Sequence, residues 1–149
     1  MKSSDGKYYK TDVVDIEGMF RIIELIPSKN AVIGNSTEVK NSILFDGVNC
    51  PLFNYVGDSI LGENAHTGAG VILSNVRSDK KNVRVKSIET NLRKMGAIAG
   101  SNAEIRCNSV VCPGTIIGAY TSIYPLIMIK GVIPSNSIVK STNEIVLKK

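Results

Sequence analysis

The stretch from Ile33 to Leu73 reads IGNSTEVKNSILFDGVNCPLFNYVGDSILGENAHTGAGVIL, and aliphatic or small residues recur in it every five or six positions. Steps of six, five and six residues repeat along it and together span 17 residues. The recurring positions therefore form three columns, which are Ile33/Cys50/Thr67, Val39/Val56/Leu73 and Leu44/Leu61. A short fixed period of this kind predicts a solenoid in which each column is one side of a triangular coil.

A second inward site is expected four residues after each of these ladder positions. This site is occupied by Thr37, Ile43, Val48, Asn54, Ile60, Ala65 and Val71. A second run with a strict step of six comprises Ala99, Ile105, Val111, Ile117, Ile123 and Ile129, with partners Ala103, Ser109, Thr115, Thr121, Ile127 and Ile133. Together the two runs predict an all-β parallel solenoid of about five coils, with glycine or small residues required at the corners.

A β-sandwich is the alternative fold, but its strands alternate with a period of two and carry turns every ~8–12 residues. The 17-residue columns do not fit that pattern. Parallel crossovers are usually right-handed, and the periodicity alone does not fix the hand of the coil.

Composition restricts the function classes. The chain has 149 residues, of which 43% are hydrophobic, so a single domain with a sizeable core is expected. Neither a secretory signal nor an apolar run near ~18 residues is present, so a soluble, cytoplasmic protein without membrane partners is expected. Cys50, Cys107 and Cys112 lack the spacing of a disulfide framework or zinc site and are expected to be small buried hydrophobic residues. With one histidine in the chain, cysteine catalysis is not favoured.

The segment 74–94 interrupts the ladder and accounts for the net charge. It carries seven basic and two acidic residues, and this excess equals the net charge of +5 for the whole chain. A long basic loop beside a rigid wall suits a phosphorylated ligand, and a merely solvated lysine-rich loop is the open alternative. Nucleic acid is not expected because interleaved aromatic residues are absent. Residues 1–20 are aperiodic and predict a loose arm, or else an imperfect first coil, before a β-helix domain of residues 21–149.

Three segments resemble a known family. They are NYVGDSILGENAHTGAG at 54–70, KMGAIAG at 94–100 and IPSNSIV at 133–139. They resemble the C-terminal acetyltransferase domain of the bifunctional glucosamine-1-phosphate acetyltransferase/UDP-N-acetylglucosamine pyrophosphorylase family, especially its archaeal sugar-nucleotidyltransferase relatives. The resemblance runs from about Ile33 to Val139 and implies a left-handed hexapeptide-repeat β-helix, a homotrimer, acetyl-CoA as donor and an amino-sugar 1-phosphate or sugar nucleotide as acceptor. The family's nucleotidyltransferase motif is absent, so pyrophosphorylase activity is not expected of this chain.

The resemblance also implies roles for individual residues. Lys40, Tyr55 and Lys81 match positions that bind the substrate. Ala69, through its backbone, and Asn75 match positions near both the acceptor and the cofactor. Cys107 and Pro125 match small residues that line the cofactor groove. No metal ligand is implied.

One departure from the family concerns catalysis. The family's catalytic histidine lies three residues before the tyrosine, and Leu52 occupies that position here. Leucine cannot accept a proton, and a positioned general base contributes typically ~10²–10⁴-fold to such a reaction. His66 is the one substitute in the chain, but its ladder position predicts that it faces outward.

Two functions therefore stay open. One is CoA-dependent acyl transfer to an amino-sugar phosphate or sugar nucleotide. The other is a catalytically lapsed trimeric module that binds sugar nucleotide or a partner subunit. A hexapeptide-fold carbonic anhydrase is excluded by the histidine count, because its metal needs three imidazole ligands.

Overall fold

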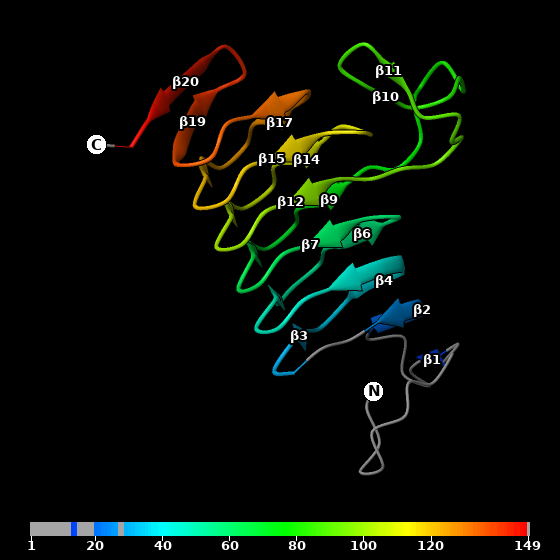
Figure 1. The fold of residues 1–149 in the computed structure, drawn as a ribbon. Coiled ribbons are helices and arrows are strands. Elements are labelled where there is room, and N and C mark those ends of the chain that lie inside the picture. Colours follow the sequence, from blue (N-terminus) through cyan, green and yellow to red (C-terminus); the bar gives the residue numbers. More distant parts are fainter. Residues whose placement is uncertain (1–12, 15–19, 27–28, 149) are drawn as a thin grey trace.

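The computed structural model describes residues 13–14, 20–26 and 29–148, with side chains from Lys29 onward. Its strands wind into a three-sided parallel β-solenoid that matches a left-handed β-helix (Figure 1). The solenoid has about six turns, one more than the sequence predicts, because β2 (Phe20–Ile26) pairs in parallel with β4 (Thr37–Leu44). No helix in the described part of the chain is long and apolar enough to cross a membrane.

The first face of the solenoid is a column of short parallel strands closed by a hairpin. Its strands are β3 (Val32–Ile33), β5 (Asn49–Cys50), β8 (His66–Thr67), β13 (Glu104–Ile105), β16 (Ser122–Ile123) and β19 (Ser137–Ser141). The last strand, β20 (Glu144–Leu147), folds back antiparallel onto β19 and ends this sheet.

The second and third faces belong to one larger sheet. After β2, the second face contains the first part of β4, then β6 (Tyr55–Gly57), β9 (Ile72–Leu73), β14 (Val110–Val111) and β17 (Met128–Ile129). The third face contains the second part of β4, then β7 (Ile60–Leu61), β12 (Ile98–Ala99), β15 (Ile116–Ile117) and β18 (Val132–Ile133). β4 spans the corner between these faces and pairs with both β6 and β7.

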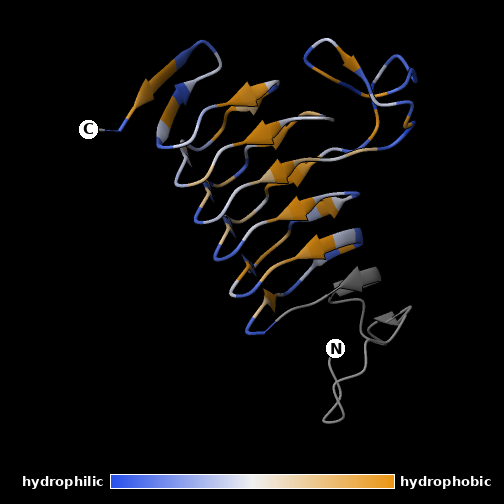
Figure 2. Ribbon diagram, in the orientation of Figure 1, coloured by the Kyte–Doolittle hydropathy of each residue, from blue (hydrophilic) through white to orange (hydrophobic). Residues whose placement is uncertain are grey.

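The predicted ladder columns form the core. Val39 pairs with Val56, and Val56 with Leu73, at the predicted 17-residue spacing. All ladder residues named above are buried except Ile33, which packs against the edge of the core. Apolar residues accordingly follow the strands, while hydrophilic residues gather at many of the corners (Figure 2).

The predicted second inward site is wrong at two positions. Ser42 and Ser59 are buried, whereas Ile43 and Ile60 lie on the outer side of the third face. These corners have a five-residue step, so the inward residue comes three rather than four positions after the ladder residue. Ile133 also differs, because it pairs with Ile117 and is itself a ladder residue of the third face.

Serine is required at this tight corner because its hydroxyl replaces a backbone acceptor. Ser42 Oγ accepts the Ser59 N–H at 3.1 Å, and Ser59 Oγ accepts the Ala97 N–H at 3.0 Å. Each hydroxyl also donates to a carbonyl of its own turn, at 2.9 Å from Ser42 to Lys40 and 2.7 Å from Ser59 to Gly57. The buried amides of successive coils are thereby satisfied without a longer corner.

Glycines at the corners have a steric role, as predicted. A Cβ on Gly34 would lie 1.8 Å from the Pro51 carbonyl oxygen, and one on Gly118 would lie 2.3 Å from the Ser135 nitrogen. Successive coils approach too closely at these points for any side chain.

Two segments lie outside the regular coils. Most of the predicted arm at 1–20 is outside the described residues; within it, β1 (Val13–Val14) pairs antiparallel with β2. The interruption of the ladder after Leu73 is an insertion that contains the hairpin β10 (Arg84–Val85) and β11 (Ile88–Glu89) and returns to the coil at β12.

The buried thiol of Cys50 makes stability depend on alkaline pH. Burial raises the pKa of this thiol from 9.0 to about 11, and the neighbouring Thr67 hydroxyl opposes this effect only in part. As pH rises through this interval, the unfolded thiol ionises first and the native state retains its proton. The free energy of unfolding should therefore fall, by up to about 3 kcal/mol once the pH passes the native value.

Urea unfolding near pH 8 and near pH 11 measures this loss. Cys50→Val removes the titrating group, keeps an apolar side chain, and should reduce the loss relative to the native chain. Equal losses in both chains would contradict the assignment to Cys50.

Candidate functional site

A group of polar side chains gathers where the second face turns into the third. We call Lys40, Tyr55, Asp58 and Asn75 the corner cluster. Lys40 is near the middle of β4 and lies opposite Gly57 in the ladder, and Tyr55 begins β6 and faces outward beside Ile72 of β9. The resemblance to the acetyltransferase family had singled out Lys40, Tyr55 and Asn75, and the fold brings these three to one corner.

Hydrogen bonds connect the cluster across coils. Asn75 Nδ2 donates to Tyr55 Oη at 3.1 Å and to Asp58 Oδ2 at 2.5 Å. Asn41 Nδ2 donates to the other carboxylate oxygen, Asp58 Oδ1, at 2.6 Å. The Asn75 side chain can donate both of its amide hydrogens because the amide carries two of them. Asn75 is buried, with an exposed fraction of 8%.

Gly57 makes room for the cluster. A Cβ at this position would lie 2.6 Å from Tyr55 Oη and 2.7 Å from Asn75 Nδ2. The absence of a side chain therefore lets the phenol and the amide meet over the backbone. Burial raises the pKa of the Tyr55 phenol, and the hydrogen bond from Asn75 partly opposes this effect.

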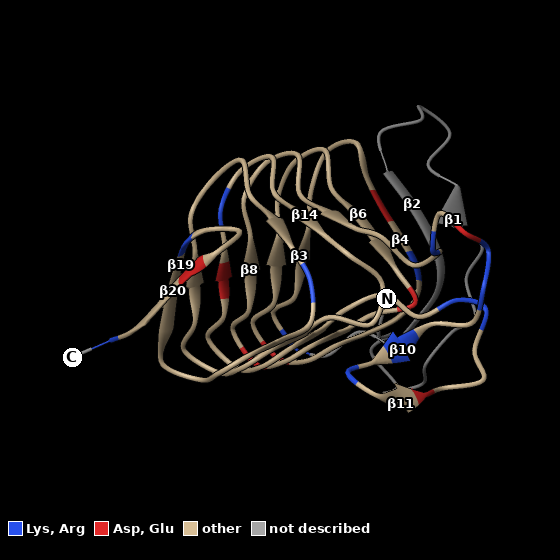
Figure 3. Ribbon diagram, turned by 90° about the horizontal axis from the view of Figure 1, so that it is seen from above, with Lys and Arg blue, Asp and Glu red and all other residues tan. Residues whose placement is uncertain are grey.

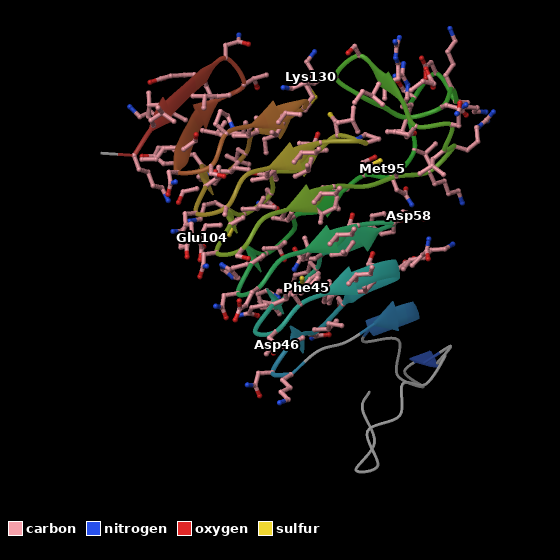
Figure 4. The ribbon with its side chains drawn as sticks, viewed as in Figure 1. Phe45, Asp46, Asp58, Met95, Glu104 and Lys130 are labelled. Carbon is pink, nitrogen blue, oxygen red and sulfur yellow. The ribbon has the colours of Figure 1, made fainter. Side chains whose placement is uncertain are left out.

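The insertion is anchored to the same corner. Met95 N donates to the Asn75 carbonyl at 3.0 Å, and Gly96 N donates to the Asp58 carbonyl at 2.8 Å. Val83 is fully buried, and a Cβ on Gly114 would lie 2.6 Å from its Cγ1, so the insertion packs against the following coil. Figure 4 shows Asp58 and Met95 on the side from which the insertion leaves, with Glu104 on the opposite side.

The insertion presents a group of cations, as Figure 3 shows around β10 and β11. Arg77 and Asp79 form an ion pair at 2.6 Å, which holds the pKa of Asp79 well below its usual range, and Arg84 lies 3.4 Å from Glu89. Five further cations of this segment form no ion pair among the described residues: Lys80, Lys81, Lys86, Arg93 and Lys94. Lys81, the third predicted substrate-binding residue, is exposed in this group.

Three of the four predicted cofactor residues share a different corner, between the first and second faces. Gly70 N donates to Leu52 O at 3.1 Å, Asn108 N to Ala69 O at 2.9 Å, and Leu126 N to Cys107 O at 3.0 Å. These bonds stack Leu52, Ala69, Cys107 and Pro125 in one column, and Cys107 and Pro125 are exposed. The expected burial of the cysteines is therefore wrong at Cys107, which lies at a corner, whereas Cys50 is buried. The fourth residue, Asn75, lies instead with Tyr55 in the corner cluster.

His66 lies apart from both corners. It sits in β8 on the outer side of the first face, opposite Glu104 of β13, and its Nδ1 is 3.0 Å from Glu104 Oε2. Arg106 approaches the same carboxylate at 3.9 Å. Within one chain, His66 and Tyr55 belong to different sheets.

Sequence reasoning missed Asp58. The residue lies within the YVGD motif that carries the family resemblance, but no role follows from that motif alone. The spacing of Asp58 could have revealed it, because Asn41 precedes Asp58 by 17 residues and Asn75 follows it by 17. One coil also has 17 residues, so these three polar side chains had to stack.

Among the described residues, no group of three or more His, Cys, Asp or Glu side chains is arranged to hold a metal ion. The chemistry available at the corner cluster is hydrogen bonding from a phenol and an amide, together with nearby cations. Such a set suits a ligand that carries both hydroxyl or amino groups and an anionic group.

The fold and the corner cluster define a hexapeptide-repeat β-helix with a polar site at one corner. Comparison with known proteins shows which proteins the chain is similar to. The chain is 42% identical over 97 residues to a bifunctional sugar-1-phosphate nucleotidylyltransferase/acetyltransferase of Sulfurisphaera tokodaii, covering 62% of this chain and 24% of that protein. It is 36% identical over 125 residues to the bifunctional protein GlmU of Methanocaldococcus jannaschii, covering 81% of this chain and 30% of that protein.

A bacterial relative, GlmU of Thermodesulfovibrio yellowstonii, is 37% identical over 98 residues, covering 66% of this chain and 20% of that protein. No family model matches the sequence. The chain is a homologue of the C-terminal part of these bifunctional proteins, which confirms the predicted resemblance. It spans less than a third of the length of each of these relatives.

Proposed function

We propose that the chain is an acyltransferase that transfers the acetyl group of acetyl-CoA to the amine of an amino-sugar phosphate or sugar nucleotide. The main support is the corner cluster, in which Tyr55 and Asn75 are hydrogen-bonded and Lys40 lies opposite Gly57 in the ladder, beside a basic insertion. The name of the Sulfurisphaera tokodaii homologue includes an acetyltransferase activity, in agreement with this proposal.

The acceptor would bind at the corner cluster. Tyr55 and Asn75 would bond the polar groups of the sugar, while Lys40 and the exposed Lys81 would attract its phosphate. Lysine acts on phosphate as a point charge, so these contacts do not require the planar geometry that arginine provides. The unpaired cations of the insertion add a positive field that concentrates anionic ligands near the site.

The donor would lie along the neighbouring corner, where Ala69, Cys107 and Pro125 stack in one column. Small residues there leave the backbone accessible to an extended cofactor. The short strands of the second face separate this column from the corner cluster. Leu52 stands in the same column and three residues before Tyr55, at the position that would lie closest to both ligands.

The chemistry of the transfer requires the amine to lose a proton. Leu52 cannot accept one, and His66 faces outward on another sheet beside Glu104. An amine of moderate pKa is partly neutral near pH 7, so attack on the thioester proceeds slowly without a positioned base. The alternative, a lapsed module that binds sugar nucleotide or a partner subunit, is favoured by Leu52 itself.

Thiol release from acetyl-CoA in the presence of glucosamine 1-phosphate distinguishes these functions. We expect slow turnover by the native chain and at least about a tenfold gain for Leu52→His, because a base is restored. A native rate near zero with a gain in Leu52→His would support the lapsed module. His66→Ala is the matched control and should leave the rate unchanged. No turnover in either chain, with no binding of CoA or sugar nucleotide, would rule out the acyltransferase.

We further propose a homotrimer, supported by the outer sides of the three faces. On the second face, Ile72, Val110 and Met128 are exposed, and on the third face a half-buried aliphatic column comprises Ile43, Ile60, Ile98, Ile116 and Val132. The first face is instead largely polar, with Asn49, His66, Glu104 and Ser122 in register. A closed ring of copies needs two different complementary surfaces on each chain, and the two apolar faces provide them.

Sedimentation velocity at micromolar concentration tests this assembly. Ile116→Glu places a charge on the third face and should dissociate the trimer. Ser122→Glu makes the same change at the equivalent outward position of the first face and should leave it intact. A monomeric native chain, or equal dissociation by both substitutions, would contradict the proposed interface.

A further inference from the structure

The carboxylate of Asp58 has no role in the chemistry described so far, although it occupies the centre of the corner cluster. Both of its oxygens accept hydrogen bonds from side-chain amides, one from Asn41 and one from Asn75. An ionised carboxylate can only accept hydrogen bonds. The amide nitrogen of Asn75, and not its carbonyl oxygen, must therefore face Asp58.

This orientation determines the polarity of the site, by which we mean whether Asn75 and Tyr55 each offer a ligand a hydrogen-bond donor or an acceptor. Both hydrogens of Asn75 Nδ2 are used, by Asp58 and by Tyr55, so Asn75 can offer only its carbonyl oxygen to a ligand. Tyr55 Oη already accepts a hydrogen bond from Asn75, so its own hydrogen stays free to be donated. No other partner of Asn75 Oδ1 or of the Tyr55 hydroxyl hydrogen occurs among the described residues.

We propose that Asp58 is a positioning residue that fixes this polarity, so that the site offers a carbonyl acceptor from Asn75 and a hydroxyl donor from Tyr55. The identity of the ligand rests on the proposed function, whereas the polarity does not. A protonated amine has hydrogens to donate and no lone pair to accept with, so it matches the carbonyl of Asn75. The native polarity therefore accommodates an amino sugar, and the reversed polarity would oppose its ammonium group, whereas a hydroxyl at the same carbon fits either polarity.

The substitution Asp58→Asn reverses the polarity while keeping the shape. Asn41 continues to donate to the new carbonyl oxygen, which turns the new amide nitrogen toward Asn75. The Asn75 amide must then flip, because two amide nitrogens cannot share a hydrogen bond. After the flip, Tyr55 donates to Asn75 Oδ1, and the group that faces the ligand from Asn75 is an N–H donor.

The phenol of Tyr55 reports the flip without any ligand. Removal of the nearby negative charge alone would lower the pKa of Tyr55, since Asp58 contributes to raising it. Loss of the hydrogen bond from Asn75 raises this pKa, and that bond has the larger effect of the two. We therefore expect a higher pKa of Tyr55 in Asp58→Asn, measured by NMR titration of labelled tyrosine and assigned with Tyr55→Phe.

Asp46→Asn is the matched control, because it removes one carboxylate from an exposed corner elsewhere and should leave Tyr55 unchanged. A lower or unchanged pKa of Tyr55 in Asp58→Asn would overturn the proposal. If that variant does not fold, NMR of the native chain still tests the orientation of the Asn75 amide. Cross-relaxation between the Asn75 side-chain amide hydrogens and the Tyr55 ring is expected, and its absence would overturn the assigned orientation.

Calorimetry with two sugar phosphates tests the selectivity of this effect, namely that the reversed polarity weakens binding of the amine more than binding of the hydroxyl. Asp58→Asn should weaken binding of glucosamine 1-phosphate by about tenfold or more, since the ammonium would face a donor. Binding of glucose 1-phosphate should change by less than about threefold, because a hydroxyl both donates and accepts. An equal loss for both ligands would contradict the selectivity. If the native chain binds neither ligand, the proposed function fails and the selectivity fails with it, while the Tyr55 titration still decides the polarity.

Discussion

Backbone hydrogen bonding between successive coils is the constraint on which the rest of the structure depends. Each strand bonds to the strand one coil away, so the number of residues in a coil decides which side chains stack on one another. The 17-residue spacing that pairs Val39 with Val56 also pairs Asn41 with Asp58 and Asp58 with Asn75. The same repeat that builds the core therefore builds the polar corner, and the site needs no separate framework.

The stacking of the core was predictable because it depends only on period and polarity. The prediction was wrong at Ile43 and Ile60, where a uniform count was extended across a corner one residue shorter. The physical reason is the pair Ser42 and Ser59, whose hydroxyls accept amide hydrogen bonds in place of a backbone carbonyl. A short polar side chain can satisfy a tight turn in a way that hydrophobic periodicity does not detect.

The site could be predicted in part. Lys40, Tyr55 and Asn75 were identified through family resemblance, and the fold places them at one corner. Asp58 was missed because the sequence motif does not distinguish a carboxylate that binds a ligand from one that orients a neighbour. The positions of Ala69, Cys107 and Pro125 beside Leu52 followed from the coil, whereas their role toward a cofactor depends on the proposed function. Leu52 occupies the position where the resemblance implies a catalytic histidine, so the sequence offers no base there for the proposed reaction.

A crystal structure of the chain with glucosamine 1-phosphate and CoA would test the central claim most directly, namely that the corner cluster binds an amino-sugar phosphate. The amine should lie within hydrogen-bond distance of Asn75 Oδ1, the Tyr55 hydroxyl should contact a sugar or phosphate oxygen, and the phosphate should face Lys40 or Lys81. The CoA should follow the column of Ala69, Cys107 and Pro125. A sugar bound at another face, or an empty corner cluster at saturating ligand, would contradict the claim.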